Sequence, residues 1–117
     1  MRILILEDDP NRHRAFKTNF APHEICITEN SKECIQLLVD ENWDMLFLDH
    51  DLGGQQMVES GENTGYEVAI FLEEHYMFRP ATVVIHSFNP IGARKMSQAL
   101  PSATVMPGAW TRRIEEF

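Results

Sequence analysis

The chain of 117 residues is short of basic side chains and contains no long hydrophobic run. Ten Lys and Arg residues stand against 18 Asp and Glu residues, so the formal net charge is -8. Proteins that wrap nucleic acid neutralise its phosphates with Lys and Arg, so this shortage argues against a basic nucleic-acid surface and against duplex DNA as a partner. It leaves open an enzyme that meets phosphate through a metal ion.

The first apolar run, ILIL at residues 3–6, is far shorter than the core of a signal peptide or a membrane span. Three acidic residues, Glu7, Asp8 and Asp9, follow it directly. We therefore expect a cytoplasmic protein without a membrane segment. The two cysteines, Cys26 and Cys34, lie outside any CxxC grouping and at apolar positions, so we expect reduced thiols in the core.

Apolar residues make up 44% of the chain, which is enough for one compact core at this length. We find no internal repeat and no linker, and we therefore expect a single domain over residues 1–117. The one shift in composition is a polar, glycine-containing stretch at residues 53–65.

Short apolar runs alternate with segments of helical periodicity along the whole chain. The runs predict strands at residues 3–6, 24–28, 45–48, 82–85 and 103–106. Helices are expected from Asp9-Pro10 up to Pro22, after the capping residue Asn30 as far as Val39, over residues 66–78, from Asn89-Pro90 to about Leu100, and as a short last helix over residues 110–116. This alternation predicts an α/β fold, a five-stranded parallel sheet with helices on both faces.

Acidic residues follow two of the predicted strands, and in open parallel sheets ligands bind beyond the carboxyl ends of the strands. If the first and third strands are neighbours, Glu7, Asp8 and Asp49 approach one another, and carboxylates that close require a cation between them. Mg²⁺ or Mn²⁺ suits such a set of oxygen ligands. The alternative, a solvated turn with a helix cap, accounts for Asp9 alone.

The segment after the fourth strand points to phosphate. Asn89-Pro90 places a helix N-terminus at the same edge, where free amides favour an anion, and Ser87 adds a hydroxyl. The alternative is that Ser87 and Asn89 are ordinary turn and cap residues.

Two histidines, His50 and His86, follow the third and fourth strands and would flank the expected metal and phosphate. Their usual pKa suits proton transfer, which suggests acid/base chemistry on a phosphoester. Alternatively, each hydrogen-bonds a backbone carbonyl or serves as a metal ligand. His13, His23 and His75 lie outside this cluster, and we expect them at the surface.

Three segments, RILILEDDP, WDMLFLDHDL and TVVIHS, resemble the receiver domain of two-component response regulators over essentially the whole chain. The resemblance implies the flavodoxin-like fold with strand order 2-1-3-4-5. It also implies that Glu7 and Asp8 hold magnesium, that Asp49 is the phosphorylated aspartate, that the main-chain carbonyl of Asp51 joins the metal, and that Ser87 is the hydroxyl residue after the fourth strand.

The chain departs from the receiver pattern at three places. Receivers have a lysine before the proline that follows the fifth strand, where this chain has Met106. The residue after Ser87 is the bulky Phe88 rather than a small one, and residues 53–64 are longer than the usual receiver loop. These departures argue against phosphorelay signalling.

LDHDLGG together with IHSFNPIGARKM is more similar to a receiver-derived branch, the cyclic-phosphate processing receiver domain. Members of this branch are predicted from context to act on cyclic phosphate ends in RNA repair or conflict systems. Arg94 and Lys95, early in the fourth helix, are placed to reach a substrate phosphate, although solvated helix residues are the simpler interpretation.

Our first hypothesis is a metal-dependent phosphoesterase that processes a cyclic phosphate on a nucleotide or an RNA end. In it, an Mg²⁺ or Mn²⁺ ion is held by carboxylates, histidines move protons, and Asp49 alternatively attacks phosphorus. The metal residues are Glu7, Asp8, Asp49 and Asp51, the catalytic residues are His50, His86, Asp49 and Ser87, and the phosphate residues are Ser87, Asn89 and Arg94. The alternatives are a non-enzymatic receiver with Asp49 as phosphoacceptor and a cyclic-nucleotide sensor.

Overall fold

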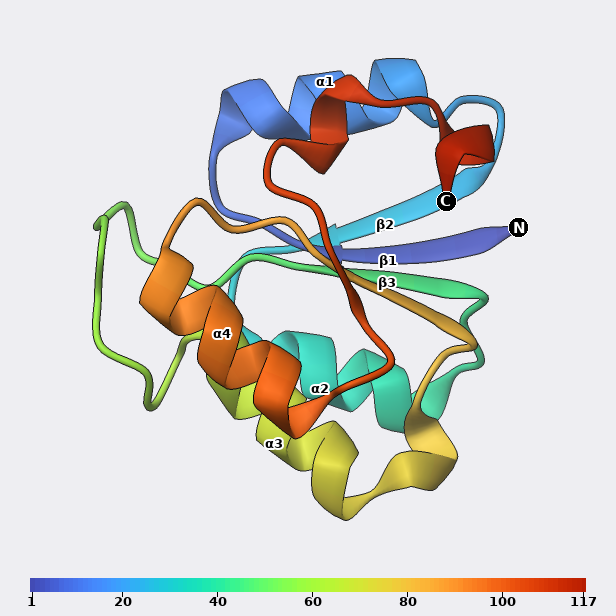
Figure 1. Cartoon of the computed structure of the whole chain (residues 1–117). Helices are drawn as coiled ribbons and strands as arrows, with labels where there is room; N and C mark the ends of the chain where they lie inside the picture. The colour runs from blue at the N-terminus through green and yellow to red at the C-terminus, as the bar shows by residue number, and fades with distance from the viewer.

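A five-stranded parallel sheet forms the centre of the structure, a computed structural model that describes residues 1–117 (Figure 1). The strands are β1 (Arg2–Leu6), β2 (Glu24–Thr28), β3 (Met45–Leu48), β4 (Thr82–Ile85) and β5 (Thr104–Val105). All neighbours pair in parallel in the order β2-β1-β3-β4-β5, which confirms the expected topology. Leu6 lies opposite Leu48, and Leu48 lies opposite Ile85, so three central strands end side by side.

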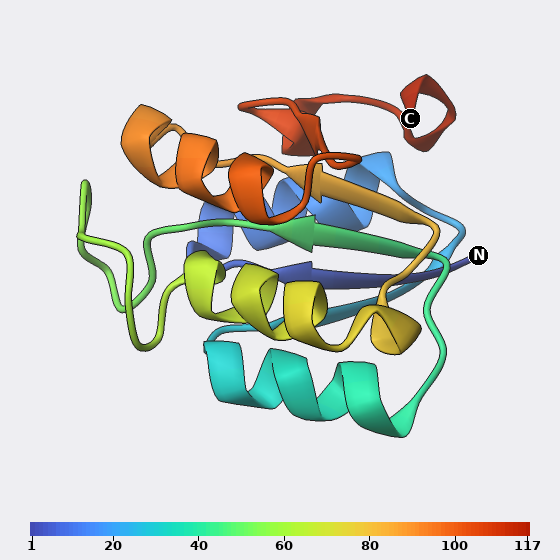
Figure 2. The ribbon, with the colours of Figure 1, turned by 60° about the horizontal axis from the view of Figure 1, so that its bottom comes forward.

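Helices cover both faces of the sheet, as predicted. They are α1 (Pro10–Asn19), α2 (Ser31–Asp40), α3 (Gly65–Glu74) and α4 (Pro90–Ala99). Figure 1 and Figure 2 show α1 and the C-terminal segment on one face and α2, α3 and α4 on the other. None of the helices has both the length and the apolar character needed to cross a membrane.

Side-chain caps begin three of the helices at the predicted residues. Asp9 accepts a hydrogen bond from the Asn11 amide at 2.8 Å, and Asn30 accepts one from the Glu33 amide at 2.8 Å. Asn89 caps α4 in the same way. Because each cap satisfies an otherwise free amide, these short polar residues fix where the chain turns from the end of a strand into a helix.

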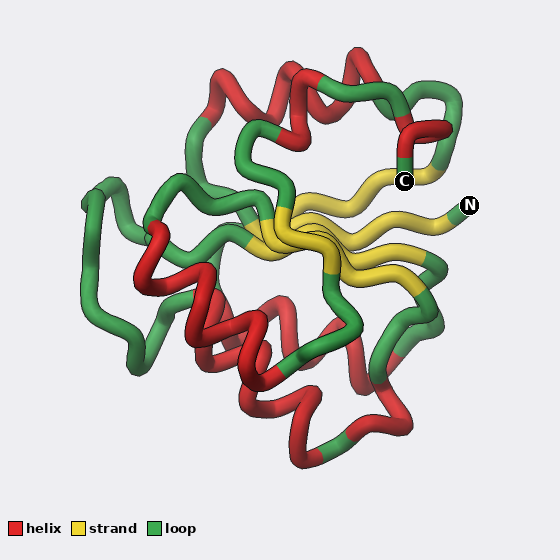
Figure 3. Tube along the Cα trace, viewed as in Figure 1, coloured by secondary structure: helices red, strands yellow, loops and turns green.

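Several predicted ends differ from the structure. The first helix ends at Asn19, because Pro22 disfavours helical backbone in the residue before it. The third helix ends at Glu74, and the separate 3₁₀ turn Tyr76–Phe78 follows. Strand β5 has only two residues, and the expected last helix consists of two 3₁₀ turns, Ala109–Thr111 and Ile114–Glu116, which Figure 3 shows as short red segments.

The sheet divides the apolar interior into two clusters, because successive side chains of a strand point to opposite faces. Leu4 and Leu6 belong to the cluster under α2, α3 and α4, whereas Ile3 and Ile5 face α1. The second cluster is rich in aromatic rings and is completed by the C-terminal 3₁₀ turns; its rings include Phe16, Phe20, Phe47 and Phe117.

Both cysteines are free thiols, as expected. Cys34 is fully buried, and burial raises its pKa to about 12. Cys26 is half-buried against the same cluster.

Gly65 packs closely against the backbone at the end of β3. A Cβ at this position would overlap with the backbone carbonyl oxygen of Asp49, whereas a Cβ at Gly61 would meet nothing within 4 Å. We expect Gly65→Ala to lower the free energy of unfolding by about 1–3 kcal/mol or more, because the backbone that the new methyl group would meet cannot move aside easily. Gly61→Ala is the matched control and should change it much less. Urea denaturation of both variants measures the difference, and equal midpoints would contradict the packing described.

Candidate functional site

A cavity of about 410 Å³ lies at the carboxyl ends of β1, β3 and β4. Its lining comes from the ends of these strands, the first turn of α1 and the loop after β3. The lining residues are Asp8, Asp9, Pro10, Arg12, Asp49, Asp51, Gly54, Gln55, Gln56, Met57, Ser87, Phe88 and Asn89. Most of them are polar or charged, so the predicted edge of the sheet forms a polar cavity.

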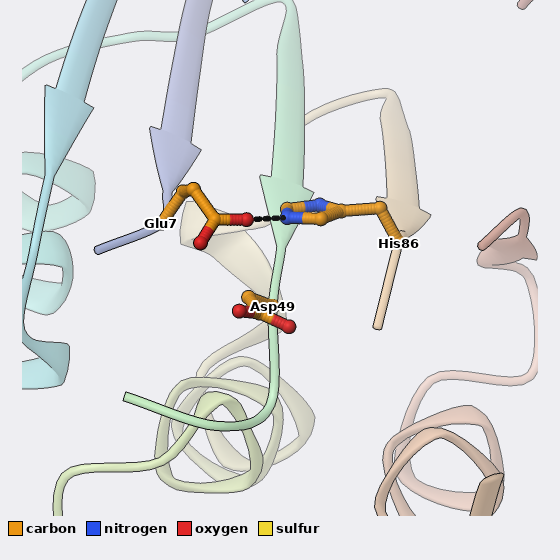
Figure 4. Close-up of side chains that lie close together, drawn as sticks. All are labelled: Glu7, Asp49 and His86. Carbon is orange, nitrogen blue, oxygen red and sulfur yellow. Dashed lines mark hydrogen bonds and ion pairs between the residues drawn. The ribbon is translucent and has the colours of Figure 1, made fainter. Parts of the chain in front are cut away.

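Glu7 is fully buried behind this cavity and has all its carboxylate oxygens engaged. Its Oε2 accepts hydrogen bonds from the amides of Asp8 and Asp9 at 3.0 and 3.1 Å. Its Oε1 lies 3.0 Å from His86 Nε2 and 3.4 Å from Arg12 Nη1, and Figure 4 shows the imidazole facing it. Burial opposes ionisation of Glu7, but the His86 contact and these donors lower its pKa to about 2.

Asp49 lies beside Glu7 in an environment that opposes its ionisation. The ligand atoms of Glu7, Asp49 and His86 all fall within 4.8 Å of one another. Burial, and after it the negative charge of Glu7, raise the pKa of Asp49 to about 8. The His50 amide donates to Asp49 Oδ1 at 2.9 Å, while Oδ2 faces Arg12 Nη1 at 3.7 Å.

Arg12 is a candidate functional residue that the sequence did not predict. From the first turn of α1 its guanidinium approaches Glu7 and Asp49, and it packs over the Trp110 ring at 4.2 Å. Its side chain is 26% exposed and lines the cavity. Met106, at the position of the receiver lysine, instead packs half-buried against the aromatic cluster. The cation of this site therefore comes from α1 rather than from the end of β5.

His50 lies beneath the loop after β3 and is fully buried. Its Nδ1 is 2.7 Å from Asp51 Oδ1, and its Nε2 is 2.8 Å from Ser60 Oγ. The Asn89 side chain donates to the same Asp51 oxygen at 3.0 Å and to the Val58 carbonyl at 3.1 Å. This network ties the polar loop to the ends of β3 and β4.

His86 occupies a different environment, between the rings of Phe16 and Trp110. Burial lowers the pKa of this imidazole, and the hydrogen bond and charge of Glu7 oppose that shift. Since Glu7 Oε1 can only accept, His86 Nε2 carries the proton, and its buried Nδ1 has no hydrogen-bond partner. Neither His50 nor His86 lines the cavity, which departs from the expected flanking pair.

The predicted phosphate residues have different surroundings. Ser87 lines the cavity, and its Oγ accepts the Asn89 amide at 3.0 Å. Asn89 itself occupies the amides expected for an anion: its side chain binds the Gly92 amide at 3.0 Å and its carbonyl binds the Ala93 amide at 2.8 Å. Arg94 is exposed and lines a neighbouring groove of about 570 Å³ instead. Asn89 therefore caps the N-terminus of α4, and these amides are not open to an anion.

The remaining histidines follow the expectation only in part. His75 is exposed, and His23 is half-buried near the N-terminus. His13 is half-buried, and its Nε2 donates to the Glu7 carbonyl at 2.6 Å, so it helps to hold the turn after β1.

Two carboxylates of the cavity fit a divalent cation. Asp8 is partly exposed and accepts only the Gly54 amide, at 2.6 Å, and Asp49 Oδ2 has no donor closer than Arg12. The carboxylate oxygens of Asp51 are both occupied, by His50 and Asn89 on one side and by the Met57 amide on the other. Glu7 is enclosed, so it supports the site from behind.

The raised pKa of Asp49 predicts a pH dependence of stability. Because its pKa in the folded state, about 8, exceeds the value of about 3.9 in an unfolded chain, its contribution to stability is complete below pH ~4 and is lost as the pH rises to ~8. Asp49→Asn lacks this loss. In EDTA, the free energy of unfolding of the variant minus that of the wild type should grow by more than about 1 kcal/mol between about pH 5 and pH 8. A constant difference across this range would contradict the burial described.

Solved receiver structures resemble this chain in fold. The phosphorylated cyanobacterial phytochrome response regulator RcpA superposes with a TM-score of 0.73 at 18% identity, covering 90% of this chain and 79% of its own. Response regulator TrrA from Thermotoga maritima, in complex with Mg²⁺ and BeF, gives 0.68 at 23% identity, covering 92% and 87%. The Mn²⁺-bound form of response regulator Rcp1 gives 0.68 at 16%, covering 98% and 84%.

At these identities the similarity establishes the fold alone. No curated protein matches the chain. The model of the cyclic-phosphate processing receiver domain matches residues 2–102, most of the chain. Together with a parallel sheet in receiver order and an acidic edge at the ends of β1 and β3, this match shows that the chain belongs to the cyclic-phosphate processing receiver domain family.

Proposed function

We propose that this domain is a metal-dependent phosphoesterase that acts on cyclic phosphates of nucleotides or RNA ends. The observation that carries the proposal is the meeting of Asp8, Asp49 and Arg12 in one cavity. Carboxylates with free oxygens hold a hard cation, and a guanidinium binds the oxygens of a phosphate. The description of the family suggests the same chemistry.

Asp8 and Asp49 would hold the cation, for which the oxygen ligands favour Mg²⁺ or Mn²⁺. A cation bound there supplies polarisation of a phosphoryl oxygen. The receivers TrrA and Rcp1, with Mg²⁺ and Mn²⁺ in their respective structures, support this choice. We give His86 no ligand role, because its Nε2 donates to Glu7 Oε1 and the imidazole does not line the cavity.

Arg12 and Ser87 bind the phosphate in this proposal. Arg12 is held by its packing over Trp110, so the guanidinium loses little freedom when a phosphate arrives. Ser87 Oγ accepts the Asn89 amide, which leaves its O–H free to donate to a phosphate oxygen. Arg94 has no part in it, because it faces the neighbouring groove.

Asp51 lines the cavity, and its Oδ1 lies 2.7 Å from Nδ1 of the buried His50. We therefore assign proton exchange to this pair. Water attacks phosphorus and the bond from phosphorus to one ribose oxygen breaks; this pair takes a proton from the water and gives one to the released ribose oxygen. His86 acts on Glu7 and is a positioning residue.

A second candidate is a non-catalytic receiver in which Asp49 accepts a phosphoryl group. Asp49 directly follows β3, and Arg12 lies 3.7 Å from its Oδ2, where a cation would neutralise an aspartyl phosphate. The two functions share the cavity but differ in their product.

Purified protein with Mg²⁺ or Mn²⁺ and a panel of 2',3'-cyclic and 3',5'-cyclic nucleotides and cyclic-ended RNA separates these functions. We expect turnover that falls roughly 100-fold or more in Asp49→Asn and His50→Ala, because each removes a group of the reaction. His75→Ala, a change to an exposed histidine on α3's far end, is the matched control and should keep full activity.

Two results would contradict the phosphoesterase. Absence of turnover with stable labelling of Asp49 by a small phosphodonor would favour the receiver. Tight nucleotide binding without product would indicate a cyclic-nucleotide sensor.

Arg12→Gln tests the phosphate contact separately. Loss of a charged hydrogen-bond partner should lower kcat/KM roughly 10- to 100-fold. Arg14→Gln is the matched control, since Arg14 is exposed on the same helix and pairs only with Asn11. Steady-state kinetics, with thermal unfolding to verify that both variants fold, provide the measurement. Equal kinetics of the two variants would remove Arg12 from the site.

A further inference from the structure

Two large apolar side chains stand exposed at the mouth of an otherwise polar cavity. Met57 is 61% exposed and Phe88 is 55% exposed, and both line it. Neither a cation nor a phosphate makes use of an apolar wall. A ligand that fills this cavity therefore gains from carrying an apolar face beside its charged group.

Phe88 is held in place on one side and open on the other. Its ring meets Trp110 edge to face, with centroids 5.4 Å apart. Gly108, two residues before Trp110, is also close to the ring: a Cβ at this position would lie 3.6 Å from Phe88 Cζ. A ring fixed by such neighbours loses little conformational freedom on binding, which favours stacking with a ligand.

The ring is also close to the cation of the site. The guanidinium carbon of Arg12 lies 5.7 Å from the Phe88 centroid and 4.2 Å from that of Trp110. These distances are short enough for one small ligand to place a phosphate on Arg12 and an aromatic group on Phe88. A nucleotide is such a ligand, because one sugar joins its phosphate to a planar aromatic base.

We propose that Phe88 stacks against the nucleobase of a single nucleotide, or of the terminal nucleotide of an RNA, whose phosphate lies on Arg12. The substrate class is thus base-bearing phosphates rather than sugar phosphates in general. This inference rests on the proposed function for the position of the phosphate. Stacking is tolerant of base identity, because every base has an aromatic face, so little sequence preference is expected.

Calorimetric titration in Mn²⁺ with adenosine 3'-monophosphate and base-free ribose 3-phosphate tests the inference. Neither compound carries a cyclic ester, so binding is measured without turnover. The wild type should bind the adenosine compound roughly 5- to 100-fold more tightly. Phe88→Ala should bring the ratio of the two affinities close to one and leave binding of ribose 3-phosphate unchanged, whereas Phe88→Trp should preserve the ratio.

Tyr76→Ala is the matched control, because Tyr76 is an exposed aromatic residue beyond α3 that does not line the cavity, and it should leave the ratio unchanged. A wild-type ratio near one, no binding of either compound, or a ratio that survives Phe88→Ala would each overturn the inference. Base-dependent binding without hydrolysis of any cyclic phosphate would refute the phosphoesterase alone. Hydrolysis without base dependence would refute the stacking alone.

Discussion

The site depends on two buried carboxylates that are held side by side. Glu7 and Asp49 follow neighbouring strands of a parallel sheet, so the register of β1 and β3 brings them together. Like charges at this range cannot both ionise freely, and the protein resolves the conflict unequally. Backbone amides and His86 hold Glu7 ionised, while the pKa of Asp49 rises to about 8.

Much of the surrounding structure supplies positive charge or fixes its position. Arg12 reaches both carboxylates and rests on Trp110, so the C-terminal turns do more than cover the sheet: they place the one guanidinium that the cavity contains. The loop after β3 is tied down through Asp8, which accepts the Gly54 amide, and Asp51, which accepts the Met57 amide. Phosphoryl transfer to Asp49, as in a receiver, and hydrolysis of a bound phosphoester would both depend on this arrangement, which explains why the fold alone does not distinguish them.

Local signals explain what the sequence predicts well. Asp9, Asn30 and Asn89 cap helices because capping depends on residues a few positions away, and the acidic strand ends meet because parallel strands end at one edge. Arg12 was missed because its position depends on Trp110, which is distant in the sequence. The burial of His50 and His86 was missed for a similar reason: the loop and the aromatic cluster that enclose them are assembled only in the folded chain.

The central claim is that the cavity binds a divalent cation and a phosphate together. The structure of crystals grown with Mn²⁺ and adenosine 3'-monophosphate tests it most directly, because anomalous scattering locates the manganese independently of the protein atoms. We predict manganese at about 2 Å from oxygens of Asp8 and Asp49, with the phosphate against Arg12. Manganese at other residues, or a phosphate bound away from Arg12, would contradict it.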